Sequence, residues 1–532
     1  MKLKGLLFRK LIKERVKEEK IELPGIKIKE KTVIVEIPTF EDETKVNITY
    51  PLIEMFAYAH IYWDSEKKSL IYEVIEPELN EEEKKKLKTI SDGLIDLVEI
   101  ELSKVRKKER AIEYLQEQVK KVLEEFNIKL TKGEYIKIMY YIYRDFIGLG
   151  KIEPLMRDPN IEDLGCDGVG IPIYVIHRKF GSVRTNVTFN DVDELRDFVI
   201  KLAERCGRYV SYAEPILDGT LPDGSRVAAT LAGDVATKGP TFSIRKFREK
   251  PFSPTELIEL KTASPEMMAY LWYIVEHRAS LLVAGGVASG KTSFLNSISM
   301  FIPPESKIVS IEDTRELMLP HEHWVPVVTR VGFGIPLPTG EKYGEITLFD
   351  LLKESFRQNP DYVIVGEVRG KEAYVMFQGM ASGNTCWGTF HAGSVDTIVK
   401  RLITPPIELS PTLVETLDCT IIMAHAKEKG KSARRVKEIV EIKSIDENGR
   451  IDGVKVFEWD PITDTYKRLS RSYLLEKLAK AKGESIESAY AEVETRKEVI
   501  EWMLKNGIKA VSYTHLRAHE TRHDLVCRLL LE

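Results

Sequence analysis

The hydrophobic and polar positions of this chain follow two different periods, and each predicts a different kind of structure. In residues 31–76 apolar and polar residues alternate, as in TVIVEIPTF and KSLIYEVIE, which predicts a small region of β-strands. In residues 81–126 the apolar positions recur at helical spacing between charged residues, which predicts two helices. No residue up to position 130 suggests chemistry, so we interpret this part as an N-terminal docking region.

The next part of the chain, residues 131–252, mixes both periods. A helix is expected over 132–150 and another over about 192–206, while the alternation in IYVIH and VRTNVTF predicts strands. The turn LPDGSR lies between two further strand-like runs. These features predict a small α+β domain that ends near Phe252.

Strands followed by helices characterise residues 253–445. Apolar runs such as LLVAG, KIVSI, YVIV and CTIIMA each predict a buried strand, and several of these strands end in polar residues. Alternating strands and helices predict an open parallel sheet, in which ligands bind at the carboxyl edge of the strands. A hairpin and further helices are expected over 446–510.

The strand LLVAG leads directly into a phosphate-binding pattern, G-x-x-x-x-G-K-[ST]. In this pattern backbone N–H groups and the start of the next helix surround a polyphosphate, while the lysine reaches the β- and γ-phosphates and the threonine hydroxyl binds Mg²⁺. A glycine-rich turn that binds nothing is the alternative, and the preceding strand and following helix argue against it. The predicted nucleotide-binding residues are Gly285, Gly286, Val287, Ala288, Ser289, Gly290, Lys291, Thr292 and Ser293.

The predicted fold class is therefore α/β, with a RecA-like P-loop NTPase domain built on a parallel sheet and preceded by a smaller α+β domain and a helical and β docking region. The predicted parts are 1–130, 131–252, 253–445, 446–510 and 511–532. The last part contains SYTHLRAHET, which resembles the translation of a common transposase-type sequencing adapter. We interpret it as a non-native tail and assign it no function.

Carboxylate side chains at two strand ends are predicted to take part in catalysis. Glu367 follows YVIVG, where many P-loop enzymes have an aspartate just before the glutamate; here that position is Gly366. We expect Thr292 and waters to hold the metal, and Glu367 to position the metal's waters or the attacking water. Glu312 and Asp313 also end a strand, and one of these carboxylates is expected to orient the attacking water. Surface acids without a catalytic role are the alternative.

Three basic side chains complete the predicted catalytic set. His391 follows an apolar strand and is a candidate for contact with the γ-phosphate, although a single histidine at a strand end is more often structural. Phosphoryl transfer also needs positive charge at its transition state, often from an arginine outside the core site. Arg226 and Arg245 in the preceding domain are candidates for this role, with ordinary surface arginines as the alternative.

Composition narrows the possible partners. The chain has 532 residues, with 79 basic against 83 acidic side chains, so no overall positive field predicts nucleic-acid binding. Its five cysteines include no C-x-x-C pair, which fits a reducing cytoplasm and argues against a zinc site. No apolar run approaches the ~18 residues of a membrane span.

The basic, amphipathic residues 1–20 are expected to dock on their own domain. Contact with a membrane surface is the alternative.

Taken together, these segments resemble the secretion ATPases of type II and type IV secretion and type IV pilus systems, including archaeal pilus and archaellum motors. The resemblance covers roughly 145–505, with GLGKIEPLMRDPNIEDLGCDG, LPDGSRV and FSIRKF matching upstream. Two departures are Asn384, where many members have a histidine, and the absence of the tetracysteine zinc insertion of bacterial type II members. The four ordered boxes of that family match GGVASGKT (285–292), SIEDTREL (310–317), RQNPDYVIVGEVRG (357–370) and GTFHAGSVDTIVKRL (388–402).

The resemblance implies a Mg²⁺-dependent ATPase that forms a homo-hexamer, binds ATP between its two domains and docks on a polytopic platform protein at the cytoplasmic face of a membrane. It also implies that His391, Arg226 and Arg245 sense or stabilise the γ-phosphate. The expected function is assembly or secretion of a type IV pilin-like filament. A hexameric DNA translocase or conjugative-export ATPase, and a nucleotide-gated scaffold that does not hydrolyse ATP, are the alternatives.

Overall fold

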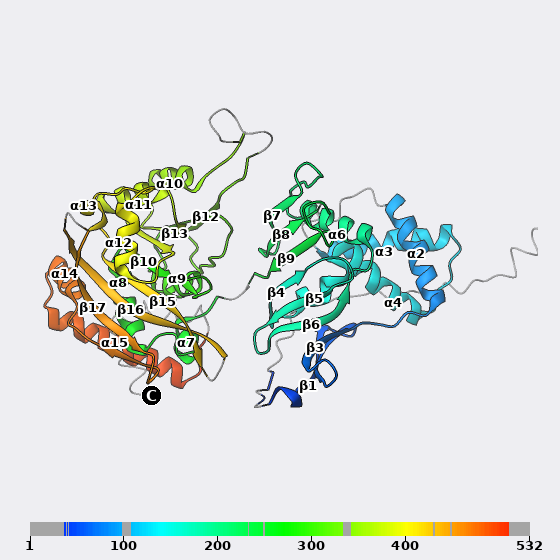
Figure 1. Cartoon of the computed structure of the whole chain (residues 1–532), viewed down its shortest axis with the longest axis horizontal. Coiled ribbons are helices and arrows are strands. Elements are labelled where there is room, and N and C mark those ends of the chain that lie inside the picture. The colour runs from blue at the N-terminus through cyan, green and yellow to red at the C-terminus, as the bar shows by residue number, and fades with distance from the viewer. Residues whose placement is uncertain are drawn as a thin grey trace, which may run out of the picture. The chain divides into compact units, whose positions relative to one another are not determined.

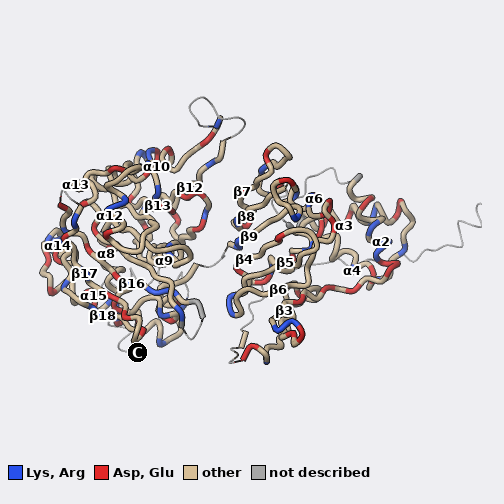
Figure 2. The backbone as a smooth tube through the Cα atoms, viewed as in Figure 1, with Lys and Arg blue, Asp and Glu red and all other residues tan. Residues whose placement is uncertain are grey.

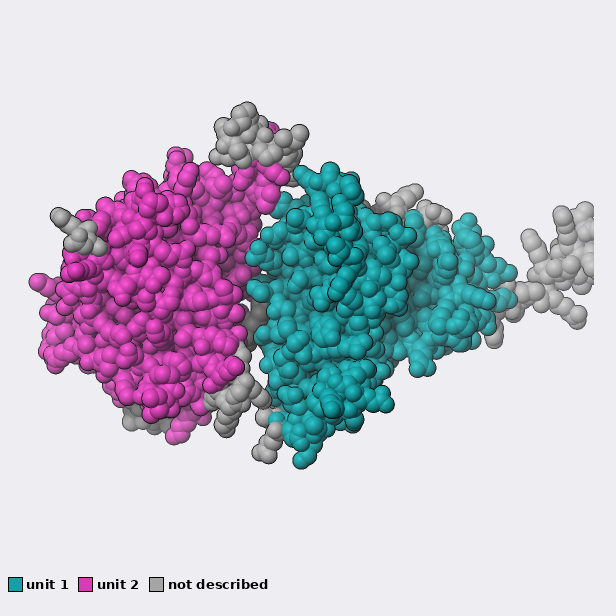
Figure 3. All heavy atoms as spheres, in the orientation of Figure 1, with its two compact units in different colours: residues 1–247 teal, residues 248–532 magenta. Residues whose placement is uncertain are grey.

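The computed structural model of the protein describes residues 37–38, 40, 42–97, 108–231, 233–247, 251–332, 342–428, 431–446 and 449–509. The chain forms two compact units, unit 1 (1–247) and unit 2 (248–532), which are coloured separately in Figure 3. The predicted boundary near Phe252 lies close to this division. The helix expected in residues 1–20 and the tail at 511–532 lie outside the described residues.

Unit 1 is built on a nine-stranded sheet with the order β1-β2-β3-β6-β5-β4-β9-β8-β7 (Figure 1). Neighbouring strands are antiparallel except β3 and β6, which pair in parallel. The strands predicted for the docking region thus extend the sheet of the α+β part and share its core. The strands are β1 (Asn47–Ile53), β2 (Ala57–Asp64), β3 (Ser69–Ile75), β4 (Ile161–Cys166), β5 (Pro172–His177), β6 (Gly181–Thr188), β7 (Ile216–Thr220), β8 (Arg226–Thr230) and β9 (Thr241–Arg245).

Two helices of unit 1, α4 and α6, begin at side-chain caps that the sequence supplies. Thr131 and Glu134 form a capping box that starts α4, and the Asp191 side chain accepts a hydrogen bond from the N–H of Glu194 at the start of α6. The helix expected over 132–150 is shorter, because its last turn widens into the π-helical segment η3. The helices are α2 (Glu81–Leu97), α3 (Lys108–Glu125), α4 (Lys132–Ile142), η3 (Tyr143–Ile147), α5 (Glu153–Arg157) and α6 (Val192–Arg205), with short 3₁₀ turns η1 (Glu43–Lys45) and η4 (Gly150–Ile152).

Unit 2 is built on a second nine-stranded sheet with the order β12-β11-β13-β14-β10-β15-β16-β17-β18. Strands β10 to β15 pair in parallel, which confirms the predicted α/β class, and β16 to β18 add antiparallel strands that continue the same sheet. The edge strand β12 was not predicted. The strands are β10 (Leu281–Gly285), β11 (Ile308–Glu312), β12 (Trp324–Val328), β13 (Tyr362–Val368), β14 (Thr385–Phe390), β15 (Cys419–Glu428), β16 (Lys431–Ile445), β17 (Ile451–Asp460) and β18 (Thr465–Arg468).

Apolar cores cover both faces of this second sheet. Leu281 and Val283 of β10 belong to one core, while Leu282 and Ala284 belong to the other. A strand buried on both faces needs a continuous apolar run, which explains the sequence LLVA. The helices are α7 (Pro254–Glu259), α8 (Pro265–Glu276), α9 (Lys291–Ile298), α10 (Leu348–Arg357), α11 (Glu372–Ala381), α12 (Val395–Ile403), α13 (Pro411–Val414), α14 (Tyr473–Lys482) and α15 (Ile486–Lys505), with the 3₁₀ turn η5 (Ser299–Phe301).

Charge is distributed evenly over both units. In Figure 2 lysine and arginine are interspersed with aspartate and glutamate along the backbone, and the sequence holds 79 basic and 83 acidic residues. Within the described ranges, no helix has both the length and the hydropathy of a membrane span.

Candidate nucleotide-binding site

Four neighbouring parallel strands of unit 2 end at one edge of the sheet, in the order β11-β13-β14-β10. Strand β11 ends at Glu312, Glu367 lies near the end of β13, and His391 directly follows β14. Strand β10 ends at Gly285, where the phosphate-binding pattern starts. Because the carboxyl ends of parallel strands meet at the same edge, the structure brings these predicted residues to the same edge of unit 2.

The loop after β10, residues 285–292, is called the P-loop below, and its glycines meet specific steric demands. A Cβ atom on Gly285 would lie 2.5 Å from Ser289 Oγ and 2.6 Å from the carbonyl oxygen of Met423, so a larger residue does not fit. Gly290 has φ +87°, in the left-handed region that favours glycine, and α9 begins immediately after it. A Cβ atom on Gly286 would meet no other atom within 4 Å. The loop is thus shaped by backbone geometry at Gly285 and Gly290.

Lys291 folds back over the loop at the first residue of α9. Its Nζ donates a hydrogen bond to the carbonyl oxygen of Gly286 at 2.8 Å, and Ser289 Oγ donates to the same oxygen at 2.8 Å. Burial lowers the pKa of Lys291, while the carboxylates of Glu367 and Glu316 act in the opposite direction. The other predicted loop residues differ in burial: Ser289 is buried, whereas Val287 is 83% exposed. A nearly buried cation therefore stands at the start of a helix, the arrangement that favours an anionic ligand.

Glu312 is a buried carboxyl group with only one of its oxygens satisfied. Its Oε1 accepts hydrogen bonds from the backbone N–H of Glu316 at 2.9 Å and of Leu317 at 3.0 Å. Its Oε2 is buried, and no atom of the described part of the chain donates a hydrogen bond to it. Burial raises the pKa of Glu312 to about 7, against the opposing effect of the two backbone hydrogen bonds. An unsatisfied buried oxygen at the edge of the sheet points to a ligand or water that completes it.

The glycine that replaces the usual aspartate before Glu367 has a steric explanation. A Cβ atom on Gly366 would lie 2.9 Å from Cγ of Glu312 and 3.3 Å from its Cβ. An aspartate therefore does not fit at position 366 while Glu312 occupies its present place. Gly366 is compatible with the buried carboxyl of Glu312. We expect the residue types at these two positions to vary together among related sequences.

Glu367 lies among basic side chains. Its carboxylate is 3.4 Å from His391 Nε2 and 3.8 Å from Nη1 of Arg369. Arg369 also forms an ion pair with Asp313, whose other carboxylate oxygen accepts a hydrogen bond from Thr329 Oγ1 at 3.2 Å. Asp313 thus belongs to an exposed charge network, unlike its buried neighbour Glu312. Arg369 was not predicted from the sequence, although its place two residues after Glu367 was a usable signal.

The two predicted arginines lie side by side in unit 1. Arg226 on β8 and Arg245 on β9 are direct partners in the antiparallel pair. Arg226 forms an ion pair with Asp218 at 3.2 Å and Arg245 with Asp163 at 3.1 Å, and both side chains are largely exposed. Because they belong to unit 1 and the P-loop to unit 2, their role at the nucleotide stays a prediction.

Arg434 of β16 contacts the P-loop. Like Arg369, it was not predicted from the sequence. Its Nε donates a hydrogen bond to the carbonyl oxygen of Ala288 at 3.2 Å. No local pattern connects position 434 with position 288; only the pairing of β16 with β15, and of β15 with β10, brings them together.

The residues at this edge fit a nucleotide with Mg²⁺. Lys291 and the start of α9 would supply positive charge for phosphates, and the half-buried Thr292 with Glu367 would supply the oxygen ligands that Mg²⁺ prefers. The unpartnered Oε2 of Glu312 fits a bound water. Such a donor set, at the carboxyl edge of a parallel sheet, defines a P-loop nucleotide-binding protein.

The chain belongs to the family of type II/IV secretion system proteins, whose sequence model matches residues 173–456. This membership confirms the resemblance found in the sequence. An archaeal relative, the uncharacterized protein MJ0900 of Methanocaldococcus jannaschii, is 40% identical over 487 residues, which are 87% of this chain and 86% of that protein.

Two further relatives carry descriptive names. The type IV secretion system protein PtlH of Bordetella pertussis is 28% identical over 275 residues, covering 46% of this chain and 79% of that protein. The solved structure of the VirB11 ATPase from the Brucella suis type IV secretion system, in complex with sulphate, matches with a TM-score of 0.28 and 22% identity, over 54% of this chain and 91% of that one.

Proposed function

We propose that this protein is a Mg²⁺-dependent ATPase that powers the assembly or secretion of type IV pilin-like filaments. In this proposal it works as a homo-hexamer on the cytoplasmic face of a membrane, docked on a polytopic platform protein. The observation that carries the ATPase part is the convergence of the P-loop, Glu312, Glu367 and His391 at one edge of the unit 2 sheet. Membership of the secretion family supports the choice of cargo.

Binding is assigned to the loop and the first turn of α9. Lys291, which is 8% exposed and pairs with Gly286 in the described structure, turns to the β- and γ-phosphates. Thr292 and Glu367 would hold Mg²⁺, which supplies positive charge that offsets the charge of the phosphates. His391, whose Nε2 is 3.4 Å from the Glu367 carboxylate, would report whether a γ-phosphate is present.

Between the two glutamates, Glu312 is the better proton acceptor. Its Oε2 is buried and unpartnered, whereas the Glu367 carboxylate is engaged by His391 and Arg369. A pKa near 7 also suits a group that must accept a proton at neutral pH.

In the proposed step the water oxygen attacks the γ-phosphorus, and the bond to the β–γ bridging oxygen breaks with its electron pair. One proton of the water moves to Oε2 of Glu312. Arg226 and Arg245 are proposed to stabilise the γ-phosphate.

The test is ATP turnover by the purified full-length chain, measured together with its mass in solution. We expect Lys291→Ala to lower turnover by at least about 100-fold, because a fixed charge on the phosphates is lost. Glu367→Gln is expected to bind ATP but hydrolyse it slowly. Lys353→Ala, which removes an exposed lysine of α10, is the matched control and should turn over normally.

Three outcomes would contradict parts of this proposal. Undiminished ATP turnover by Lys291→Ala would contradict the assignment of the P-loop as the catalytic nucleotide site. Stimulation of turnover by DNA, but not by anionic liposomes, would favour a DNA translocase over a filament motor. A chain that remains a monomer at all nucleotide concentrations would exclude the hexamer.

A further inference from the structure

Strand β16 carries an arginine side chain to the P-loop. The Nε of Arg434 donates to the carbonyl oxygen of Ala288 at 3.2 Å, and its Cγ lies 3.2 Å from the position that a Cβ atom on Gly290 would occupy. The side chain thus forms a hydrogen bond with the loop, and its aliphatic stem occupies the space beside Gly290. Its place is fixed by the sheet, because β16 pairs with β15 and β15 pairs with the strand that enters the loop.

The residue that Arg434 holds has an unfavourable backbone conformation. Ala288 has φ +55°, in the left-handed region that residues with a Cβ atom rarely adopt. Such a conformation persists only when its surroundings hold it in place. Of the neighbouring contacts, the Arg434 hydrogen bond acts directly on the Ala288 carbonyl.

Fixing that carbonyl also fixes the next N–H group. The peptide bond between Ala288 and Ser289 is trans, because the cis bond of the described chain is at Pro405–Pro406. In a trans peptide the C=O and the following N–H point in opposite directions. With the Ala288 carbonyl turned to Arg434, the Ser289 N–H therefore points away from Arg434. Loop N–H groups are the donors that bind phosphate in this pattern.

We infer that Arg434 is a positioning residue for nucleotide binding, which holds the Ala288–Ser289 peptide so that the Ser289 N–H is presented to a phosphate. The inference rests on the proposed nucleotide binding and deepens it. Arg434 acts on the loop and leaves proton transfer to other residues, so it sets affinity and leaves the chemical step unchanged. Arginine suits the task better than lysine, because its planar guanidinium fixes the direction of the Nε–H bond.

The experiment is titration of the full-length protein with a fluorescent ADP analogue and with ATP, beside steady-state turnover. Arg434→Ala and Arg434→Lys are expected to raise the dissociation constant and KM about tenfold, while kcat at saturating ATP changes less than about twofold. Lys427→Ala removes an exposed cation of the same hairpin and is the matched control, with unchanged affinity expected. Unchanged affinity in both Arg434 variants would overturn the inference.

A second variant separates loop positioning from direct contact with the nucleotide. Glycine adopts the left-handed conformation without a steric penalty. In an Ala288→Gly background the loop depends less on Arg434, so Arg434→Ala should raise the dissociation constant by clearly less than tenfold. An equal loss of affinity in both backgrounds would overturn the positioning role. Wild-type protein that binds no nucleotide would contradict the proposed function itself, a result distinct from the other two.

Discussion

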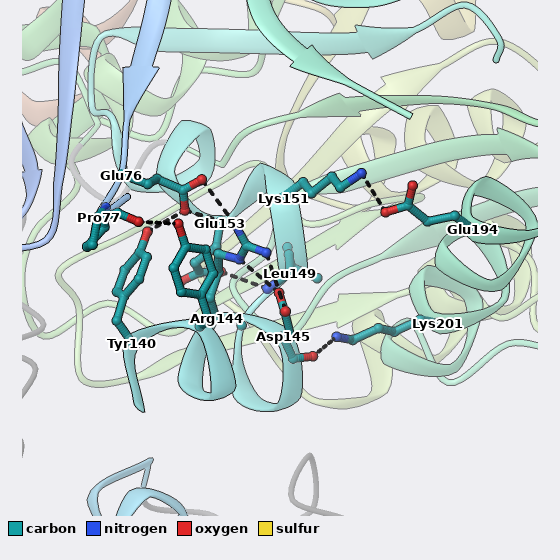
Figure 4. Close-up of polar contacts among 12 residues, drawn as sticks. Glu76, Pro77, Tyr140, Arg144, Asp145, Leu149, Lys151, Glu153, Glu194 and Lys201 are labelled. Carbon is teal, nitrogen blue, oxygen red and sulfur yellow. Dashed lines mark hydrogen bonds and ion pairs between the residues drawn. The ribbon is translucent and has the colours of Figure 1, made fainter. Parts of the chain in front are cut away.

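Two polar clusters in this molecule differ in how completely their hydrogen-bonding groups are satisfied. In unit 1, Arg144 is almost buried and both oxygens of Glu76 accept from its Nη1 at 3.0 Å, while its Nε donates to Asp145 at 2.8 Å (Figure 4). The Tyr140 hydroxyl also donates to Glu76 at 2.6 Å. Burial lowers the pKa of Arg144, but the carboxylates of Asp145 and Glu76 raise it by a larger amount. The net shift of this pKa is therefore upward. Each charge in this cluster has a partner of opposite sign.

The edge of the unit 2 sheet is built differently. There Glu312 keeps a buried oxygen with no donor in the described structure, and Ala288 stays in a left-handed conformation. The nearest basic group to Glu367, His391, stands at 3.4 Å. A satisfied polar network makes a fold rigid, whereas unsatisfied groups and strained backbone at a shared edge are typical of a functional site. The Arg144 cluster thus has the features of a structural network, whereas the edge of the unit 2 sheet has those of a functional site.

The largest effect that tests this comparison is expected for Arg144→Met. The change leaves the Glu76 carboxylate without its strongest partner in a mostly buried place, which costs about 3 kcal/mol of unfolding free energy. Hydrogen exchange should show amides of α4 and η3 losing protection by that amount, while β10 in unit 2 keeps its protection. Arg196→Met removes an exposed arginine of α6 and should leave both regions unchanged. Equal loss of protection in both units would contradict a local structural role.

The P-loop could be predicted from sequence because its signal is local. Gly285, Gly290, Lys291 and Thr292 lie within one short segment, and each residue type follows from phosphate chemistry or from backbone geometry. The parallel sheet was predictable for a similar reason, since apolar runs and the helices between them alternate along the chain. Strand β12 was missed although its sequence WVPVV is apolar, because a proline inside a short run argues against a strand unless the strand lies at the edge of a sheet, as β12 does.

The Arg144 cluster and the Arg434 contact could not be predicted in the same way. Glu76 and Arg144 are separated by 68 positions, and Ala288 and Arg434 by 146. Tertiary packing alone decides such pairs, because an arginine in a charged helix or strand is usually solvated. The burial that raises the pKa of Glu312 is likewise a property of the folded sheet, although its place at a strand end was visible in the sequence.

An effect of intermediate size is expected for Glu312→Gln. It concerns how the free energy of unfolding changes with pH. Folding raises the pKa of Glu312 from 4.5 to about 7, so the folded state binds more protons between these values and the wild type loses stability as pH rises through them. Between pH 5 and pH 8 this loss of stability amounts to about 2.5 kcal/mol, which is smaller than the effect expected for Arg144→Met. Glutamine has no such titration, so the variant should gain on the wild type as pH rises.

The measurement for Glu312 is thermal or denaturant unfolding between pH 5 and pH 8 without nucleotide, taken as the difference between variant and wild type. Glu322→Gln, at an exposed position, is the control and should show a constant difference from the wild type. A constant difference for Glu312→Gln as well would mean that its carboxyl is solvated, and the contrast between the two clusters would fail.

The smallest effect is expected for an ion pair at the rim of the unit 1 cluster, Lys151 with Glu194 (Figure 4). The two charged atoms are only 2.6 Å apart, but the side chains are 35% and 41% exposed. Solvent screens such a pair, so a double-mutant cycle with Lys151→Met and Glu194→Gln should give a coupling below about 1 kcal/mol that shrinks further as salt is added. The corresponding cycle for Arg144 and Glu76 should give a larger, less salt-sensitive value. Equal couplings for the two pairs would show that burial does not decide their strength.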